Sequence, residues 1–142
     1  MSTIREQILA AIKTALTGTT GVDVRIYRSR PEAISRGESP AILIEPVGNS
    51  PVQPVIGFLD NVFTVRISVI ARGAVPDQVA DPTIASLHAK IMADLTLGGL
   101  AMDIQPGATN YLIEEGDQPA AVISCDYNVI HRTSLTDLTT GN

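Results

Sequence analysis

The chain has 142 residues, a usual length for one domain with a single hydrophobic core. Its apolar fraction is 44% but its aromatic fraction only 4%, so Ile, Val, Leu and Ala must build that core. The formal net charge of -5 argues against a general duplex-DNA binder, because such a protein needs many cationic contacts to phosphate.

The cysteine content and the N-terminus bear on the compartment. Cys125 is the only cysteine, which excludes an intramolecular disulfide and a cysteine-based zinc site and fits a reducing compartment. The first 11 residues carry Arg5 and Glu6 and lack a cleavage pattern, so they are not a secretory signal. No apolar run approaches the roughly 18 residues of a membrane span. We therefore expect a soluble protein made in a cytoplasm.

The N-terminal segment is predicted to be a helix followed by a short strand. Thr3 and Glu6 fit a capping box, and apolar residues then recur at helical spacing to about Leu16. Residues 22–28 are predicted to form a strand with Val24 on its apolar face.

The next segment is predicted to contain two strands and two loops. Residues 29–40 are polar and interrupted by Pro and Gly, which predicts a surface loop. Residues 41–45 form an apolar strand, and residues 46–57, with three prolines and two glycines, are predicted to be an exposed loop. Residues 61–72 alternate apolar and polar side chains, which is typical of a half-buried antiparallel strand.

A second helix is predicted from the pattern that follows residue 80. Asp81 and Pro82 fit an N-cap and a first helical residue, and Gly98 and Gly99 fit the end of the helix. Its apolar stripe would consist of Ile84, Leu87, His88, Ile91, Met92 and Leu95.

The C-terminal third is predicted to be a hairpin and a tail. Residues 101–105 are short and apolar, and residues 110–114 form a strand. A turn at residues 116–119 leads into a long alternating strand at residues 120–132. Residues 133–142 are a polar tail, expected to be mobile in the free subunit.

This order of elements, α-β-β-β-α-β-β, predicts an α+β fold. Strands that come in runs favour a mixed or mainly antiparallel sheet with two helices packed on one face. We expect residues 1–132 to form the single domain and residues 133–142 to lie outside it.

None of the common catalytic constellations is present in the sequence. His88 and His131 lie in no metal-binding spacing, and Cys125 would be a nucleophile only if the fold placed a histidine beside it. The acids at positions 114, 115 and 117 lack the pattern of a calcium loop and fit a solvated hairpin tip. We predict no enzyme, no cofactor and no metal site.

Arginines are the candidate partner-binding residues. Four of the eight arginines lie within twelve residues, where they would contact phosphate or an acidic neighbouring subunit, or simply face solvent. The candidate interface residues are Arg25, Arg28, Arg30, Arg36, Arg66, Arg72 and Arg132.

Two segments carry a resemblance to a known family. Residues 85–104 contain a helix with an early His and a Met-Ala-Asp end, followed by Thr-Leu-Gly-Gly-Leu-Ala and an acidic-apolar strand. Residues 129–138 read Val-Ile-His-Arg-Thr-Ser-Leu-Thr-Asp-Leu. Both segments resemble phage tail terminator (tail completion, minor tail protein U-like) proteins. The Pro-rich segment at residues 46–57 departs from the usual pattern of that family.

The resemblance implies a structural virion protein without catalytic residues. Such proteins form a ring, typically of six copies, that caps the finished tail tube, stops its growth and joins the tail to the head. The implied partners are further copies of the chain, the tail tube protein and a head-tail connector or stopper protein. Such a subunit is assembled in the host cytoplasm and ends in the neck of the virion. DNA would pass the lumen without specific binding, and an acidic lumen would repel it.

Two other classes of function remain open at this point. One is another neck or tube component, such as a head-completion or stopper protein. The other is a small-ligand-binding α+β module or a minor enzyme.

Overall fold

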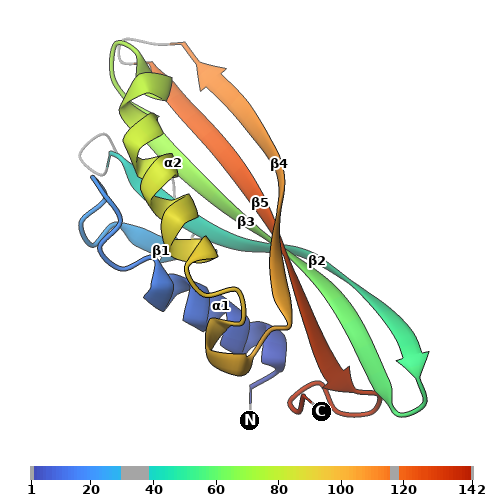
Figure 1. The fold of residues 1–142 in the computed structure, drawn as a ribbon. Helices are drawn as coiled ribbons and strands as arrows, with labels where there is room; N and C mark the ends of the chain where they lie inside the picture. The colour runs from blue at the N-terminus through green and yellow to red at the C-terminus, as the bar shows by residue number, and fades with distance from the viewer. Residues whose placement is uncertain (1, 30–38, 116–118, 142) are drawn as a thin grey trace.

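The computed structural model describes residues 2–29, 39–115 and 119–141 (Figure 1). The predicted α+β class and the order α-β-β-β-α-β-β are confirmed, and both helices lie on one face of the sheet. Most of the loop predicted at residues 29–40 and of the turn at residues 116–119 lies outside the described residues. The elements are α1 (Ile4–Ala15), β1 (Ile26–Arg28), β2 (Ala41–Val55), β3 (Phe58–Arg72), α2 (Pro76–Met92), the short 3-10 helix η2 (Leu97–Gly99), β4 (Asp103–Glu114) and β5 (Ala120–Ser134).

The sheet has the strand order β1-β2-β3-β5-β4. The β1 and β2 strands are parallel, and the other neighbours are antiparallel, so the sheet is mixed as predicted. The central pair, β3 and β5, keeps one register from Phe58 opposite Ser134 to Arg72 opposite Ala120. The strands β1 and β4 therefore form the two lateral edges of the sheet.

The core lies between the two helices and the inner face of the sheet. The Thr3 side chain caps α1 by accepting a hydrogen bond from Glu6 N at 3.1 Å, and Ile8 and Ile12 of that helix are buried. Leu87 and Ile91 of α2 are also buried, as the helical stripe predicts. From the sheet, the core receives Ile42, Ile44, Phe63, Val65, Ile67, Val69, Ala71, Ala121, Ile123, Cys125, Tyr127 and Val129.

The first strand is shorter than predicted. The backbone of Gly21 and Asp23 takes positive φ angles of 86° and 55°, which bends the chain at the place where the strand was expected to begin. The strand therefore starts only at Ile26, and Val24 is 85% exposed instead of lying on an apolar face.

The Pro-rich segment at residues 46–57 was wrongly predicted to be a loop. Most of it is the second half of β2, which pairs with β3 as far as Val55 and carries two irregularities in its register. Prolines are tolerated there because β1 pairs only with residues 42–44, so the outer edge of β2 beyond that point needs no N–H donors. The exposure of this segment was predicted correctly.

The start and end predicted for the second helix were also wrong. The helix begins at Pro76, which serves as the first-turn proline, and Pro82 lies inside it. It ends at Met92, and the Asp94 carboxylate then accepts hydrogen bonds from Thr96 N and Gly98 N in a separate turn. Of the predicted stripe, His88 and Leu95 are exposed instead of packed in the core.

The two short segments predicted at residues 101–105 and 110–114 are one strand. Around the bulge between Pro106 and Thr109, β4 stays close to β5, and a Cβ atom on Gly107 would lie 3.2 Å from the Asp126 carbonyl oxygen. The predicted hairpin with the long C-terminal strand is confirmed.

The C-terminal residues are bound to the rest of the fold, against the expectation of a mobile tail. Thr133 is buried in β5, and Ser134 N donates to the Thr140 carbonyl at 2.9 Å. Ile4 N, at the start of α1, donates to the Leu138 carbonyl at 2.8 Å. These backbone bonds hold the C-terminal segment beside the start of α1, so the two ends of the chain lie near one another (Figure 1).

Candidate assembly surface

The outer face of the sheet, away from both helices, carries a row of polar pairs. Residues directly opposite each other on β3 and β5 form these pairs, and each pair is joined through its side chains. The pairs are Asp60–Arg132, Thr64–Asn128, Arg66–Asp126 and Ser68–Ser124. We call this set the polar ladder. It lies on the two central strands, on the sheet face opposite to α1 and α2 (Figure 1).

The two charged rungs of the polar ladder are internally compensated. Arg66 Nε lies 2.9 Å from Asp126 Oδ1, and Arg132 Nε lies 2.7 Å from Asp60 Oδ1. The hydrogen bond from Arg132 lowers the pKa of Asp60, and the hydrogen bond to Asp126 raises the pKa of Arg66. The ladder is therefore strongly polar but carries no excess of either charge.

A small apolar cluster follows the polar ladder at one end of the same face. Ala41 is fully buried and Ile70 is 9% exposed, and Tyr27, Leu43 and Val122 pack against them. Tyr27 lies opposite Leu43, and Ile70 lies opposite both Ala41 and Val122, so this cluster spans the four adjacent strands β1, β2, β3 and β5. The outer face thus carries polar pairs, interrupted by the apolar pair Val62–Ile130, and an apolar cluster at one end.

The described arginines of the predicted interface lie in different parts of the molecule. Arg66 and Arg132 belong to the polar ladder, whereas Arg72 lies at the end of β3, where its backbone N–H donates to Ser39 Oγ at 2.8 Å. Arg30 and Arg36 lie outside the described residues.

Arg25 and Arg28 lie at the β1 side of the molecule. The Arg25 guanidinium donates to the Pro40 and Gly21 carbonyl oxygens at 2.9 and 2.8 Å. Arg28 Nη1 forms an ion pair with Glu6 Oε2 at 2.7 Å, which connects β1 to the first turn of α1. Of these two cations, only Arg28 is paired with a carboxylate among the described residues.

The hairpin of β2 and β3 extends beyond the helical layer (Figure 1). Its apolar side chains are exposed: Val52 by 63% and Ile56 by 93%. Leu135 N donates to the Gly57 carbonyl at 2.8 Å, which fastens the tip to the end of β5. We call this hairpin the exposed arm. Valines between the prolines of residues 46–57 favour a strand, but the prolines led to the prediction of a loop.

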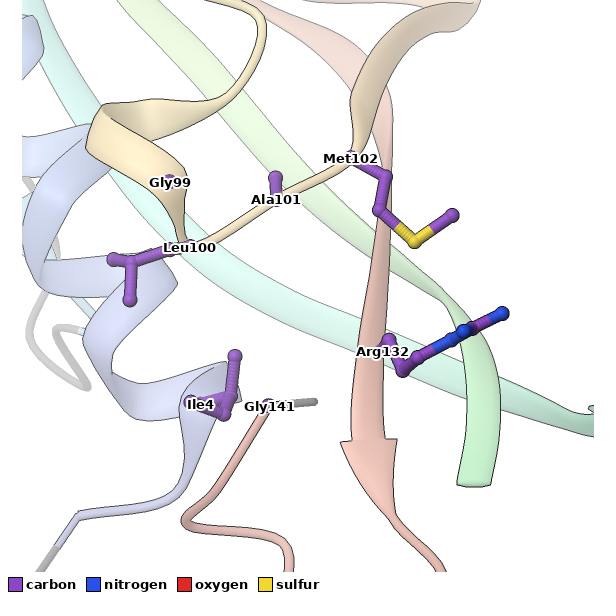
Figure 2. A pocket seen from close by; sticks show the side chains of 7 residues that line it. All are labelled: Ile4, Gly99, Leu100, Ala101, Met102, Arg132 and Gly141. Atoms are coloured by element: carbon purple, nitrogen blue, oxygen red, sulfur yellow. The ribbon is translucent and has the colours of Figure 1, made fainter. Parts of the chain in front are cut away.

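Figure 2 shows a hollow of about 230 Å³ beside the start of α1. It is lined by Ile4, Arg132, Gly141 and residues 99–102. The Arg132 side chain points away from the hollow, and its guanidinium is bound to Asp60. Among the described residues that line it, the hollow therefore offers no free charged group to orient a ligand.

The histidine, cysteine and tyrosine side chains that could take part in catalysis lie in different surroundings. His88 Nδ1 is 2.8 Å from the Tyr127 hydroxyl at the edge of α2. Cys125 and His131 are buried in β5, where burial raises the pKa of the thiol and lowers the pKa of the imidazole. Among the described residues, no three His, Cys, Asp or Glu side chains are grouped as a metal site would need.

None of the described helices is both long and apolar enough to cross a bilayer.

Comparisons with known proteins show a likeness in fold and none in sequence family. No family model matches the chain, and no curated protein sequence matches it. A solved chain described as "Virion of native gene transfer agent (GTA) particle" has a similar fold, with a TM-score of 0.54 and 16% sequence identity. The match covers 90% of this chain and 92% of that chain. At this identity, the two chains are shown to share a fold.

Proposed function

We propose that the chain is a structural subunit of a phage or phage-like virion and forms a ring that caps the tail tube. The observation that carries this proposal is the fold match over nearly the whole length of both chains with a protein of a gene transfer agent virion. The Leu-Gly-Gly-Leu segment at residues 97–100 and the Arg-Thr-Ser segment at residues 132–134 add the resemblance to tail terminators. The ring, most simply a hexamer, would stop tube growth and present the surface for joining the head.

The polar ladder fits the inner surface of such a ring. A lumen that lets DNA pass must not offer unpaired cations, because each free Lys or Arg near a phosphate adds affinity. On the ladder, Arg66 and Arg132 are each neutralised by a carboxylate of the same chain. We propose that this face lines the lumen, and that the net charge of -5 per subunit adds a weak repulsion.

The proposed partners are further copies of the chain, the tail tube protein and a head-tail connector or stopper protein. The exposed arm of β2 and β3 and the bound C-terminal segment are the candidates for contacts along the ring axis, because both project from the same end of the sheet (Figure 1). The assembled subunit would reside at the neck of the virion.

The proposal is tested by adding purified protein to tail tubes that are still able to elongate. We expect a ring at one tube end in negative-stain electron microscopy, and no further growth when tube subunits are added. Binding to isolated heads but not to tubes would instead support the stopper or head-completion role. Failure to bind either structure, at concentrations well above those of the tubes, would contradict a neck function.

A further inference from the structure

The outer edge of β4 is an unpaired strand edge that exposes apolar side chains. In the described part of the chain no strand pairs with this edge, since β4 is the last strand of the sheet. Its second half contains neither proline nor lysine, which commonly protect edge strands. Instead it exposes Tyr111 by 62%, Leu112 by 57% and Ile113 by 54%. We call residues 111–113 the β4 ridge.

The opposite side of the molecule offers a depression. A hollow of about 240 Å³ lies beside β1 and is lined by Lys13, Thr17, Asp23, Val24 and Ile26. Val24 is 85% exposed at its margin. We call it the β1 hollow. An apolar ridge on one side and a partly apolar hollow on the other are the two halves of a head-to-tail contact.

The charges on the two sides are also complementary. Glu114 and Glu115 directly follow the β4 ridge, are exposed, and have no ion-pair partner among the described residues. Lys13, which lines the β1 hollow, is exposed. Arg25 stands between the lining residues Val24 and Ile26 in the chain, and its guanidinium is bound only to carbonyl oxygens in the part of the chain that the structure describes. Asp23 is a single acid against these two cations. One edge is therefore acidic and the other basic.

The two features lie at the same level along the strands. A single cross-strand row runs through the whole sheet, from Ile26 in the β1 hollow to Tyr111 in the β4 ridge. The residues between them in this row are Ile42, Val69 and Ile123. A neighbour that is rotated about an axis along the strands, without a shift along that axis, brings ridge and hollow together. Head-to-tail contacts without such a rise close into rings, whereas those with a rise make filaments.

We propose that the β4 ridge of one copy packs against the β1 hollow of a second copy, with Glu114 and Glu115 facing Lys13 and Arg25. This inference rests on the proposed ring function, to which it adds the two contact surfaces. Each copy uses different residues on its two sides, so the contact repeats until the ring closes.

Cross-linking between single-cysteine sites tests the contact directly. The variants are Val24→Cys and Ile113→Cys, and the parent chain is the control, because its own Cys125 is buried. With a short bismaleimide linker, we expect covalent dimers when the two variants are mixed, and no more than the parent yields when each is treated alone. The chain that carries both substitutions should give a ladder of products that stops at the ring number.

Two outcomes of this cross-linking would overturn the proposal. Dimers from Ile113→Cys alone would show that two β4 edges pair with each other, which is a symmetric and different interface. No dimers from the mixture, under conditions in which rings are seen by electron microscopy or the protein is highly concentrated, would show that these edges do not meet.

Charge reversal provides a second, independent test. Glu114→Lys with Glu115→Lys should lower the cross-linking yield about tenfold or more, because like charges then face each other. Adding Lys13→Glu and Thr17→Glu, which both line the β1 hollow and leave position 24 for the cysteine, should restore it, and both of these sites are exposed. Asp77→Lys with Asp81→Lys on α2 makes the same change in net charge away from the edges and should leave the yield unchanged. An equal loss in this control, or no restoration, would contradict the contact.

These tests separate the contact from the proposed function. Tubes that are capped by a protein without cross-links between the two edges would retain the function and reject the contact. Cross-linked rings that never bind tubes would retain the contact and reject the capping role.

Discussion

The Nδ1 atom of His88 on α2 lies 2.8 Å from the hydroxyl of Tyr127 on β5, so a helix and a central strand are joined by one polar contact at the margin of the core. Tyr127 is 3% exposed, and burial raises the pKa of its hydroxyl to about 12. Tyr127→Phe removes the hydroxyl without changing the ring. We expect a loss of about 0.5–1.5 kcal/mol in the free energy of unfolding, measured by chemical denaturation.

The contribution of this contact is isolated by a double-mutant cycle with His88→Ala. If the contact stabilises the fold, the losses in free energy of unfolding of the two single variants sum to more than the loss of the double variant. Strictly additive losses would show that the hydroxyl and the imidazole act independently.

The buried His131 predicts a pH dependence of stability. Its side chain is 1% exposed and its ring lies edge-on to Phe63, with 6.2 Å between the ring centroids. Burial lowers its pKa below the ordinary value of 6.5, so the unfolded chain takes up a proton at a higher pH than the folded one. The stabilising effect is fully present above about pH 6.5 and is lost as the pH falls towards the lowered folded value.

The variant His131→Phe tests this pH dependence. We expect the difference in free energy of unfolding between variant and parent to favour the variant increasingly as the pH falls below about 6.5. Denaturation at a series of pH values measures this difference. A difference that stays constant across the series would show that His131 does not take part in acid destabilisation.

The second helix gives a test of which face of the predicted stripe is packed. Leu87 is fully buried, whereas Leu95, which was predicted to lie on the same stripe, is 38% exposed beyond the end of α2. Leu87→Ala should cost about 2–5 kcal/mol, because it removes core contacts and leaves a cavity. Leu95→Ala is the matched control and should cost clearly less. Similar losses at both positions in chemical denaturation would contradict the helix boundaries described above.

The polar ladder predicts an effect on DNA. Asp60→Asn combined with Asp126→Asn removes the carboxylates paired with Arg132 and Arg66 on the outer face of the sheet, and leaves Glu45 opposite Arg66 as the remaining acid. We expect salt-sensitive binding of short duplex DNA to increase, because the two guanidinium groups lose the carboxylates that bind them and become available to phosphate. Fluorescence anisotropy at low salt measures the affinity.

The control for the DNA experiment changes the same number of charges elsewhere. Asp77→Asn with Asp81→Asn alters the net charge equally but lies on α2, on the other side of the sheet. If both double variants bind DNA equally, the effect comes from net charge alone, and the compensated ladder has no special role.

The sequence predicted the elements in which one face is buried and one is exposed. The alternation at residues 61–72 and 120–132 survives in β3 and β5, since a half-buried strand shows its period in the side chains themselves. The second half of β2 has no such period, because both of its faces are exposed, and its prolines are compatible with a strand only where the outer edge is free. That freedom depends on the length of β1, which local sequence does not determine.

The same reasoning explains what was missed in the candidate site. The arginines were predicted, but their carboxylate partners lie about 60 to 72 residues away in the chain, so the compensation of Arg66 and Arg132 follows only from the pairing of β3 with β5. The β4 ridge was read as an ordinary strand because nothing in residues 110–114 indicates that β4 is the last strand of the sheet. Edge position is a property of topology, and it decides whether an apolar strand is core or interface.

The bound C-terminal segment gives the last prediction. Leu138 supplies the carbonyl that accepts from Ile4 N at the start of α1, and Thr140 accepts from Ser134 N at the end of β5. A chain truncated after Ser134 loses both bonds, so we expect it to fold with a free energy of unfolding lower by about 1–3 kcal/mol. Amide exchange should accelerate most in the first turn of α1, whereas Ile67 and Cys125, which lie opposite each other in the central strands, should accelerate only as far as the lower global stability requires. If the segment also contacts the tube, the truncated chain will cap tubes poorly at temperatures where it remains fully folded. Capping at the parental level under those conditions would limit the segment to holding the start of α1 against the end of β5.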